Sequence, residues 1–65
     1  MNLKGEISVI KNDKAKVFIR EKGLLTNLLD VAEHVGPLKT NDKVVVSFYG
    51  NTFTDGIISA KVKEG

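Results

Sequence analysis

The sequence predicts an all-β fold, a small five-stranded barrel with at most one short helical turn. Apolar and polar residues alternate along most of the first third of the chain, as they do in half-buried strands. Turn-forming residues recur about every eight to twelve positions, a spacing typical of small sandwiches and barrels. Residues 42–62 hold more β-branched and aromatic residues than any other stretch. At 65 residues, the chain is expected to form a single domain, residues 1–65, with a thin core.

The first strand is expected over Leu3–Lys11. Its inward face would hold Leu3, Gly5, Ile7 and Val9, and its outward face Lys4, Glu6 and Ser8. A glycine inside a strand marks a bulge or a bend. We therefore expect Gly5 at a point where the sheet curls over itself, as a closed barrel requires.

A tight hairpin is expected to join this strand to the second. Asn12 and Asp13 tolerate positive φ and lie between two alternating segments, which is a hairpin signal. The second strand is predicted over Lys14–Glu21. Its inward residues would be Ala15, Val17 and Ile19, and its outward residues Lys14, Lys16, Phe18 and Arg20.

Two structures are compatible with the next segment, Leu24–Val35, which follows a turn at Lys22-Gly23. The local pattern favours a short helix with Asn27 as its cap and Gly36-Pro37 as its stop. The apolar residues at helical spacing are Leu25, Leu28, Leu29, Ala32 and Val35. The alternative is a third strand with Leu25, Asn27, Leu29 and Val31 on one face, followed by a helical turn through Ala32–Val35. Because isolated short helices are marginal in water, packing decides between the two.

The closing half of the chain is predicted as a strand pair. After the break at Gly36-Pro37, a turn through residues 38–42 leads into a strand over Lys43–Tyr49, and Gly50-Asn51 supplies the next turn. The returning strand is expected over Phe53–Val62, with Asp55-Gly56 as a bend or bulge inside it. The alternative is that Asp55-Gly56 ends a longer loop, so that the last strand is Ile57–Lys63. By alternation with Val44 and Val46, Phe48 is expected in the core.

These elements favour one kind of small barrel. Four strands, a fifth possible strand and a strongly curled first strand indicate an OB-like barrel, with an SH3-like barrel as the near alternative. Neither kind needs more than one helical turn.

The sequence offers no constellation of catalytic or metal-binding residues. It has no cysteine, and its one histidine, His34, lacks a spaced partner. The aspartates are spaced for turns and caps rather than for a calcium loop, and the glycines form no phosphate-binding loop. We therefore expect no catalytic residue, no metal site and no cofactor, and we expect that the chain is not an enzyme.

The candidate interaction surface consists of exposed aromatic and basic side chains. Phe18 and Tyr49 are both expected on the outside, with Lys16 and Arg20 near Phe18. The net charge of +2 is mild and the lysines are spread along the chain, whereas a nucleic-acid binder more often shows a concentrated stripe. Protein–protein contact is the preferred interpretation. The alternative is a single-stranded nucleic-acid-binding barrel, which would need a basic groove and aromatics on which bases stack.

No membrane span is expected from the sequence. Its longest apolar segment is only a few residues, against the roughly 20 that cross a bilayer, and its first residues have no apolar signal core. Together with the absence of cysteine, this predicts a cytoplasmic protein.

The order of motifs resembles the OB-fold domain of tailed-phage baseplate assembly and tail-spike proteins, and small prophage barrel proteins. The similar stretches are Gly-Glu-Ile-Ser-Val-Ile (5–10), Ala-Lys-Val-Phe-Ile (15–19), Leu-Thr-Asn-Leu-Leu-Asp-Val-Ala (25–32), Leu-Lys-Thr-Asn-Asp-Lys-Val-Val-Val-Ser-Phe (38–48) and Asp-Gly-Ile-Ile-Ser-Ala-Lys-Val (55–62). The Gly-Asp turn of that family reads Asn41-Asp42 here, and its final Gly is Ala60.

The resemblance implies that residues 25–31 form a strand, with only a helical turn near Ala32–Val35. It also implies a non-enzymatic structural or assembly module, a tail, baseplate or connector component that binds other phage structural proteins or itself, with a homo-oligomer expected. Such a protein would be assembled into a phage-like particle. The spike extension of the baseplate proteins has no counterpart here, so an assembly or adaptor role is expected rather than membrane piercing.

Overall fold

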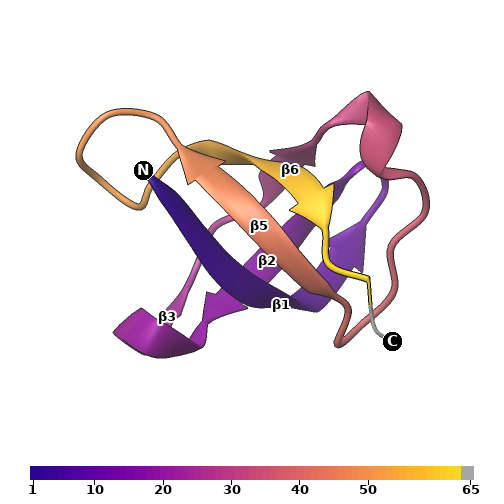
Figure 1. Ribbon diagram of the computed structural model, residues 1–65, viewed down its shortest axis with the longest axis horizontal. Helices are drawn as coiled ribbons and strands as arrows, with labels where there is room; N and C mark the ends of the chain where they lie inside the picture. Colours follow the sequence, from indigo (N-terminus) through magenta and orange to yellow (C-terminus); the bar gives the residue numbers. More distant parts are fainter. Residues whose placement is uncertain (64–65) are drawn as a thin grey trace.

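The computed structural model describes residues 1–63 and consists of six strands and two single 3₁₀ turns (Figure 1). The strands are β1 (Asn2–Lys11), β2 (Lys14–Ile19), β3 (Leu24–Leu25), β4 (Leu29–Val31), β5 (Lys43–Phe48) and β6 (Gly56–Lys61). The turns are η1 (Arg20–Lys22) and η2 (Glu33–Val35). The prediction of an all-β fold is confirmed, although there are two helical turns and the sequence predicted at most one.

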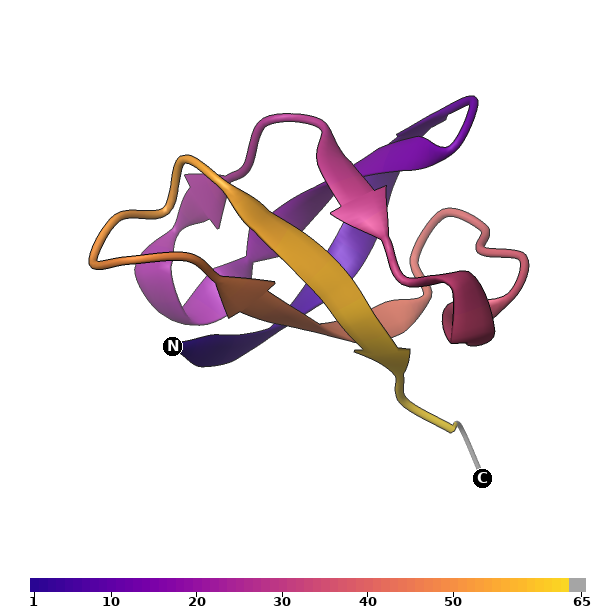
Figure 2. The same cartoon turned by 90° about the horizontal axis from the view of Figure 1, so that it is seen from above.

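The barrel closes because β1 is long enough to pair on both sides. Its residues 2–6 pair with β5, and its residues 6–11 pair with β2. The ring is completed in the order β1-β5-β6-β4-β2, with β4 and β6 parallel and β3 paired only to β2. These five strands form the ring, which Figures 1 and 2 show as a closed barrel, and the OB-like prediction is confirmed.

Gly5 lies at the point where β1 passes from one side of the barrel to the other. It pairs with Val44, and the next residue, Glu6, pairs with both Lys43 and Phe18. A Cβ atom on Gly5 would lie 2.3 Å from Val17 Cγ1 and 2.9 Å from the Phe18 carbonyl oxygen. The strand therefore bends where only glycine fits, as the sequence predicted.

The core is the inward face of the ring. Nine hydrophobic side chains are buried there: Ile7, Ala15, Val17, Ile19, Leu29, Val44, Val46, Phe48 and Ile58. The predicted inward residues of β2 and the predicted core position of Phe48 are confirmed. The prediction that Val9 faces inward is wrong, because a bulge between Ile7 and Val9 shifts the register with β2 and leaves Val9 exposed.

The segment that was compatible with helix or strand is an interrupted strand. The local helix prediction is wrong, and both the strand and the helical turn after it are confirmed, the strand in two pieces, β3 and β4. Between them Thr26 is buried, and its hydroxyl accepts the Val17 N–H at 2.9 Å and donates to the Asn27 carbonyl at 2.8 Å. The predicted shared face fails, because Leu25 lies opposite Phe18 on the outer face whereas Leu29 lies opposite the buried Ala15, and Asn27 is exposed in the interruption between the two strands.

Several predicted turns are present where the sequence placed them. Asn12 has a φ of 55° in the two-residue turn between β1 and β2. Gly36 ends η2 and is followed by Pro37. Asp42 Oδ2 accepts the Lys39 N–H at 2.9 Å, which holds the turn before β5 and lowers the pKa of the Asp42 carboxyl, with a further contribution from Lys61.

The turn after β5 is a loop, not a tight hairpin. Gly50 and Asn51 belong to it, Tyr49 N–H bonds to the Asp55 carbonyl at 3.0 Å, and β6 starts only at Gly56. The interpretation of Asp55-Gly56 as a bend inside the last strand is therefore wrong, and the longer-loop alternative holds. Gly56 is required for another reason, since a Cβ there would lie 2.7 Å from the Ser47 carbonyl oxygen.

Candidate interaction surfaces

The structure brings together three of the four side chains predicted to form an interaction surface. Lys16 and Phe18 share the outer face of β2, because residues two apart point the same way in a strand. The Arg20 guanidinium, on η1, lies 5.9 Å from the centre of the Phe18 ring. These three residues form the β2 outer face.

Tyr49 does not belong to the β2 outer face. It follows Phe48, whose N–H bonds to the Met1 carbonyl, whereas Phe18 pairs with Glu6. Met1 and Glu6 are separated by five steps along β1, roughly 17 Å at the rise of a strand. The two aromatics predicted to act together therefore lie on different parts of the surface.

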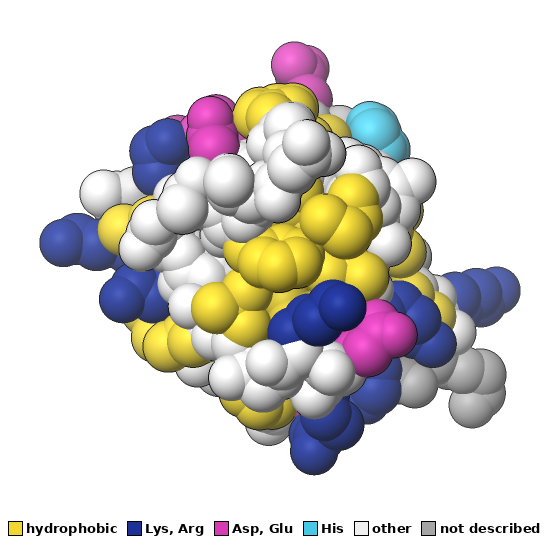
Figure 3. All heavy atoms as spheres, turned by 90° about the vertical axis from the view of Figure 1, so that its left-hand side faces the viewer, with side chains coloured by type: hydrophobic (Ala, Val, Ile, Leu, Met, Phe, Trp, Pro, Cys, Tyr) yellow, Lys and Arg dark blue, Asp and Glu magenta, His cyan; other side chains and the backbone are white. Residues whose placement is uncertain are grey.

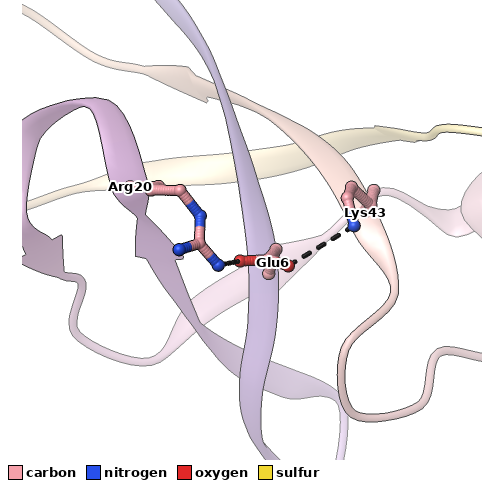
Figure 4. A network of polar contacts seen from close by, with 3 residues as sticks. All are labelled: Glu6, Arg20 and Lys43. Atoms are coloured by element: carbon pink, nitrogen blue, oxygen red, sulfur yellow. Dashed lines mark hydrogen bonds and ion pairs between the residues drawn. The ribbon is translucent and has the colours of Figure 1, made fainter.

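The cation beside Phe18 is held by a carboxylate (Figure 4). Arg20 Nη2 donates to Glu6 Oε1 at 2.6 Å, and Lys43 Nζ donates to Glu6 Oε2 at 3.4 Å. The hydrogen bond from Arg20 and then that from Lys43 hold the pKa of Glu6 below its ordinary value of 4.5. Glu6 thus links η1 to β5 across the outside of β1.

Replacing Glu6 by glutamine is expected to flatten the acid limb of the stability profile. Because the pKa of Glu6 is lower in the folded state, its contribution is complete above pH 4.5 and is lost as the pH falls through the folded-state pKa. Urea unfolding of wild type and Glu6→Gln at several pH values below 5 measures this. Equal slopes with pH for the two proteins would show that the network adds nothing to acid stability.

A second pairing neutralises charge at the other end of β2. Lys14 Nζ is bonded to Asp30 on β4, a contact that raises the pKa of Lys14. Two of the three cations near this face, Lys14 and Arg20, thus have carboxylate partners within the chain. Lys16 alone adds charge to the β2 outer face without such a partner among the described residues. That is a weak electrostatic surface for a polyanion.

Exposed apolar residues also lie at one end of the barrel, which we call the open end. They are Met1, Leu25 and Tyr49, with exposed fractions of 52%, 48% and 53%. Leu3, Leu24 and Phe53 are partly buried and pack against the core. Phe53 holds the loop after β5 in place by packing edge-on against Phe48, with ring centres 5.3 Å apart. Figure 3 shows this end, with hydrophobic side chains gathered near its centre, a basic and an acidic side chain directly beside them, and other basic side chains toward its margins.

Sequence reasoning found only Tyr49 of the three exposed residues at the open end. Met1 is apolar, and hydropathy alone does not show that it lies on the surface. Leu25 fitted the apolar side of both structures considered for its segment. No local signal identified either residue, because the exposure of Leu25 follows from its pairing with Phe18 on the outer face, a contact between different strands.

The opposite end of the barrel carries a groove of about 510 Å³. The β1–β2 hairpin forms one side of it, and the segment after η2 forms the other, with Ile10, Ala15, Val31, Pro37 and Leu38 among its lining residues. The two ends lie at opposite extremes of the long axis, which measures 29 Å (Figure 1).

The described residues, 1–63, hold no group of titratable side chains of a metal-binding kind. No cluster of three or more His, Cys, Asp or Glu that would hold a metal ion is found in that range. His34 is exposed, and its Nε2 lies 2.9 Å from the Ser59 carbonyl oxygen, which accepts a hydrogen bond from it. In the same part of the chain, no helix has the length and hydrophobicity needed to cross a bilayer.

No protein-family model matches this chain, and no curated protein matches it.

Proposed function

We propose that this protein is a non-enzymatic assembly module that associates with other protein chains, a second copy of itself included, through the open end of its barrel. The observation that carries the proposal is the exposure of Met1, Leu25 and Tyr49 at the end of the barrel where hydrophobic side chains gather (Figure 3). A gathering of exposed apolar side chains marks an interaction site.

The composition of the open end agrees with that role. Tyrosine and methionine are among the residues enriched in protein interfaces, and a rigid aromatic loses little conformational entropy on binding. A 65-residue domain also buries only about 60% of its unfolded surface, so burying more apolar area against another chain would add to its stability.

The class of partner follows from the resemblance to phage OB-fold domains. We propose that the partners are structural proteins of a phage-like tail, baseplate or connector. The chain would then be made in the cytoplasm and built into the particle. The alternative function, binding of single-stranded nucleic acid, receives less support, because Phe18 and Tyr49 lie apart and Arg20 and Lys14 are paired with Glu6 and Asp30.

Self-association is tested by light scattering over a range of protein concentrations. The mass of the wild type is expected to rise above the 7.1 kDa of one chain. The double variant Leu25→Ser/Tyr49→Ser is expected to weaken association by about tenfold or more, which is 1.4 kcal/mol. Ile10→Ser removes a similarly exposed apolar residue from the other end and is the matched control.

Two outcomes would overturn the proposal. One is a wild type that stays monomeric at millimolar concentration. The other is a double variant that associates as strongly as the wild type while circular dichroism shows that both are folded. Titration of a labelled single-stranded oligonucleotide at low and moderate salt is the companion measurement. Tight binding that weakens steeply with salt would favour the alternative function.

A further inference from the structure

One main-chain edge of the barrel is open beside the β1–β2 hairpin. The Ile7 N–H donates to the Asp42 carbonyl at 2.9 Å, and the Ile7 carbonyl accepts the Asn41 N–H at 2.8 Å. The main chain of Ile7 therefore faces away from β2. Ser8 is the extra residue of the bulge, so Ile10, three residues later, faces the same way.

Among the described residues, no strand lies beside Ile10 on that side. β5 begins at Lys43, which pairs with Glu6, so the neighbouring strand ends before the hairpin does. Outside the ladder with β2, no main-chain hydrogen bond of Ile10 is found among residues 1–63. An exposed edge with one unpaired N–H and C=O is a template for another extended segment.

Apolar surface adjoins this edge. Val9 and Ile10 are 45% and 42% exposed, and Ile10 lines the groove of about 510 Å³. Ala15, Val31 and Leu38 contribute further apolar lining. A strand added along Ile10 would therefore direct alternate side chains toward this groove, which is how strand-addition sites gain specificity.

The charges around the groove favour a basic partner. Its lining includes two carboxylates, Asp13 and Glu33. Lys14 is the one cation among the described lining residues, and its ammonium is already bonded to Asp30. A cationic side chain that enters the groove would therefore meet two carboxylates, Asp13 and Glu33, in a lining whose described cation is paired with Asp30.

We propose that the Ile10 edge and the groove bind an extended segment of a partner protein in which apolar and basic side chains alternate. The proposal rests on the proposed assembly function and names a second contact and its chemistry. The partner residue opposite Ile10 exchanges two main-chain hydrogen bonds with it. Because alternate side chains of a strand point to opposite faces, the basic side chains of the segment enter the groove, where Asp13 and Glu33 lie, and its apolar side chains lie on the other face, against the exposed Val9.

A second copy fits this edge less well. Two hairpins paired about a two-fold axis through Ile10 would place Lys11 opposite Val9 of the copy and diagonal to the copy's own Lys11. The same arrangement would bring together two groove rims that each hold Asp13 and Glu33. Like charges at both positions oppose the symmetric contact.

The probe for the test is a labelled peptide, acetyl-Val-Lys-Val-Lys-Val-Lys-amide, followed by fluorescence anisotropy. The acidic counterpart, with Glu in place of Lys, is the charge control. The wild type is expected to bind the basic peptide at least about tenfold more tightly than the acidic one. Asp13→Asn/Glu33→Gln is expected to remove that preference. Equal binding of both peptides by the wild type, or binding of neither, would overturn the proposal.

Strand addition itself is tested by removing the main-chain donor. Ile10→Pro lacks the N–H but suits an edge position, and it is expected to weaken binding of the basic peptide at least about tenfold. A basic peptide N-methylated at alternate residues tests the same hydrogen bonds on the wild-type protein, so the result does not depend on the variant folding. Undiminished binding of the N-methylated peptide would contradict strand addition.

The failures of the two proposals are distinguishable. Loss of self-association in Leu25→Ser/Tyr49→Ser with peptide binding intact would support the open end as the contact between copies and leave the groove proposal standing. Self-association that is abolished by Ile10→Pro but unaffected by Leu25→Ser/Tyr49→Ser would assign the hairpin edge to a second copy. That result would overturn the partner proposed here.

Discussion

Replacing Gly5 by alanine is expected to destabilise the protein by about 3 kcal/mol, at the upper end of what overpacking a core costs. The added Cβ would lie 2.3 Å from Val17 Cγ1, 2.8 Å from Ile19 Cδ1 and 2.9 Å from the Phe18 carbonyl oxygen. The side chains have little room to give way inside a full core, and the carbonyl belongs to the backbone of β2. For a domain of this size, such a loss is a large part of the total stability.

Urea unfolding of Gly5→Ala, Val17→Ala and the double variant measures this effect. Truncating Val17 removes the shortest of the three contacts, so the double variant is expected to be more stable than the sum of the single losses predicts. If the free energy of unfolding of Gly5→Ala lay within about 0.5 kcal/mol of the wild-type value, the close approach of β1 to β2 would not require glycine. If the losses of stability in the two single variants simply added up in the double variant, the Cβ of the alanine at position 5 would not be in contact with Val17.

Replacing Thr26 by valine is expected to cost about 2 kcal/mol although the two side chains have nearly the same shape. The Thr26 hydroxyl accepts the buried Val17 N–H and donates to the Asn27 carbonyl. Valine would leave the Val17 N–H without a partner inside the barrel, and an unsatisfied buried donor costs about 1–3 kcal/mol.

Thr26→Ser is the matched control, because it keeps the hydroxyl and loses only a methyl group worth about 0.8 kcal/mol. In thermal and urea unfolding, Thr26→Ser is expected to be more stable than Thr26→Val. The reverse order would mean that the Thr26 hydroxyl does not stand in for the ladder hydrogen bond that β2 lacks in the gap between β3 and β4.

Local pattern predicted the elements whose signals are local. The alternation of Ala15, Val17 and Ile19 was enough to place β2 and its inward face. Asn12-Asp13 was enough to place the turn before it. In both cases neighbouring residues hold the whole signal, so no distant contact was needed to interpret it.

The helix-or-strand segment could not be resolved locally, because its structure depends on a distant partner. Leu25, Leu28 and Leu29 have helical spacing in the sequence. Pairing of Leu29 with Ala15, and of the Thr26 hydroxyl with the Val17 N–H, decides for strand. Packing of this kind overrides the weak preference of a short isolated helix.

The candidate surfaces were the least predictable part of the molecule. Phe18 and Tyr49 were grouped because both were expected to be exposed, but the register of β1 with β2 and β5 separates them. The exposure of Val9 depends on a bulge that alternation does not reveal. At both ends of the barrel, apolar residues are exposed where a neighbouring strand stops. The positions at which strands stop depend on how the ring closes, which the local sequence does not show.

The length of β1 connects the fold to both proposed contacts. Because β1 serves two neighbours in succession, its first residues extend beyond β2 toward the open end and its last residues extend beyond β5 into the hairpin. Met1 and Ile10 therefore lie near opposite ends of one strand. A single folding requirement, closure of the ring, leaves two separate surfaces available to partners.

The most direct test of the central claim is a dilution series of the isotopically labelled protein followed by amide NMR. If the open end is the contact between copies, the amide signals of Asn2, Leu25 and Tyr49 shift with concentration, and those of Lys14 and Lys16 stay constant. Constant signals at the open end, with shifts at Lys16 and Phe18 on addition of a single-stranded oligonucleotide, would contradict the assembly function and favour a nucleic-acid-binding barrel.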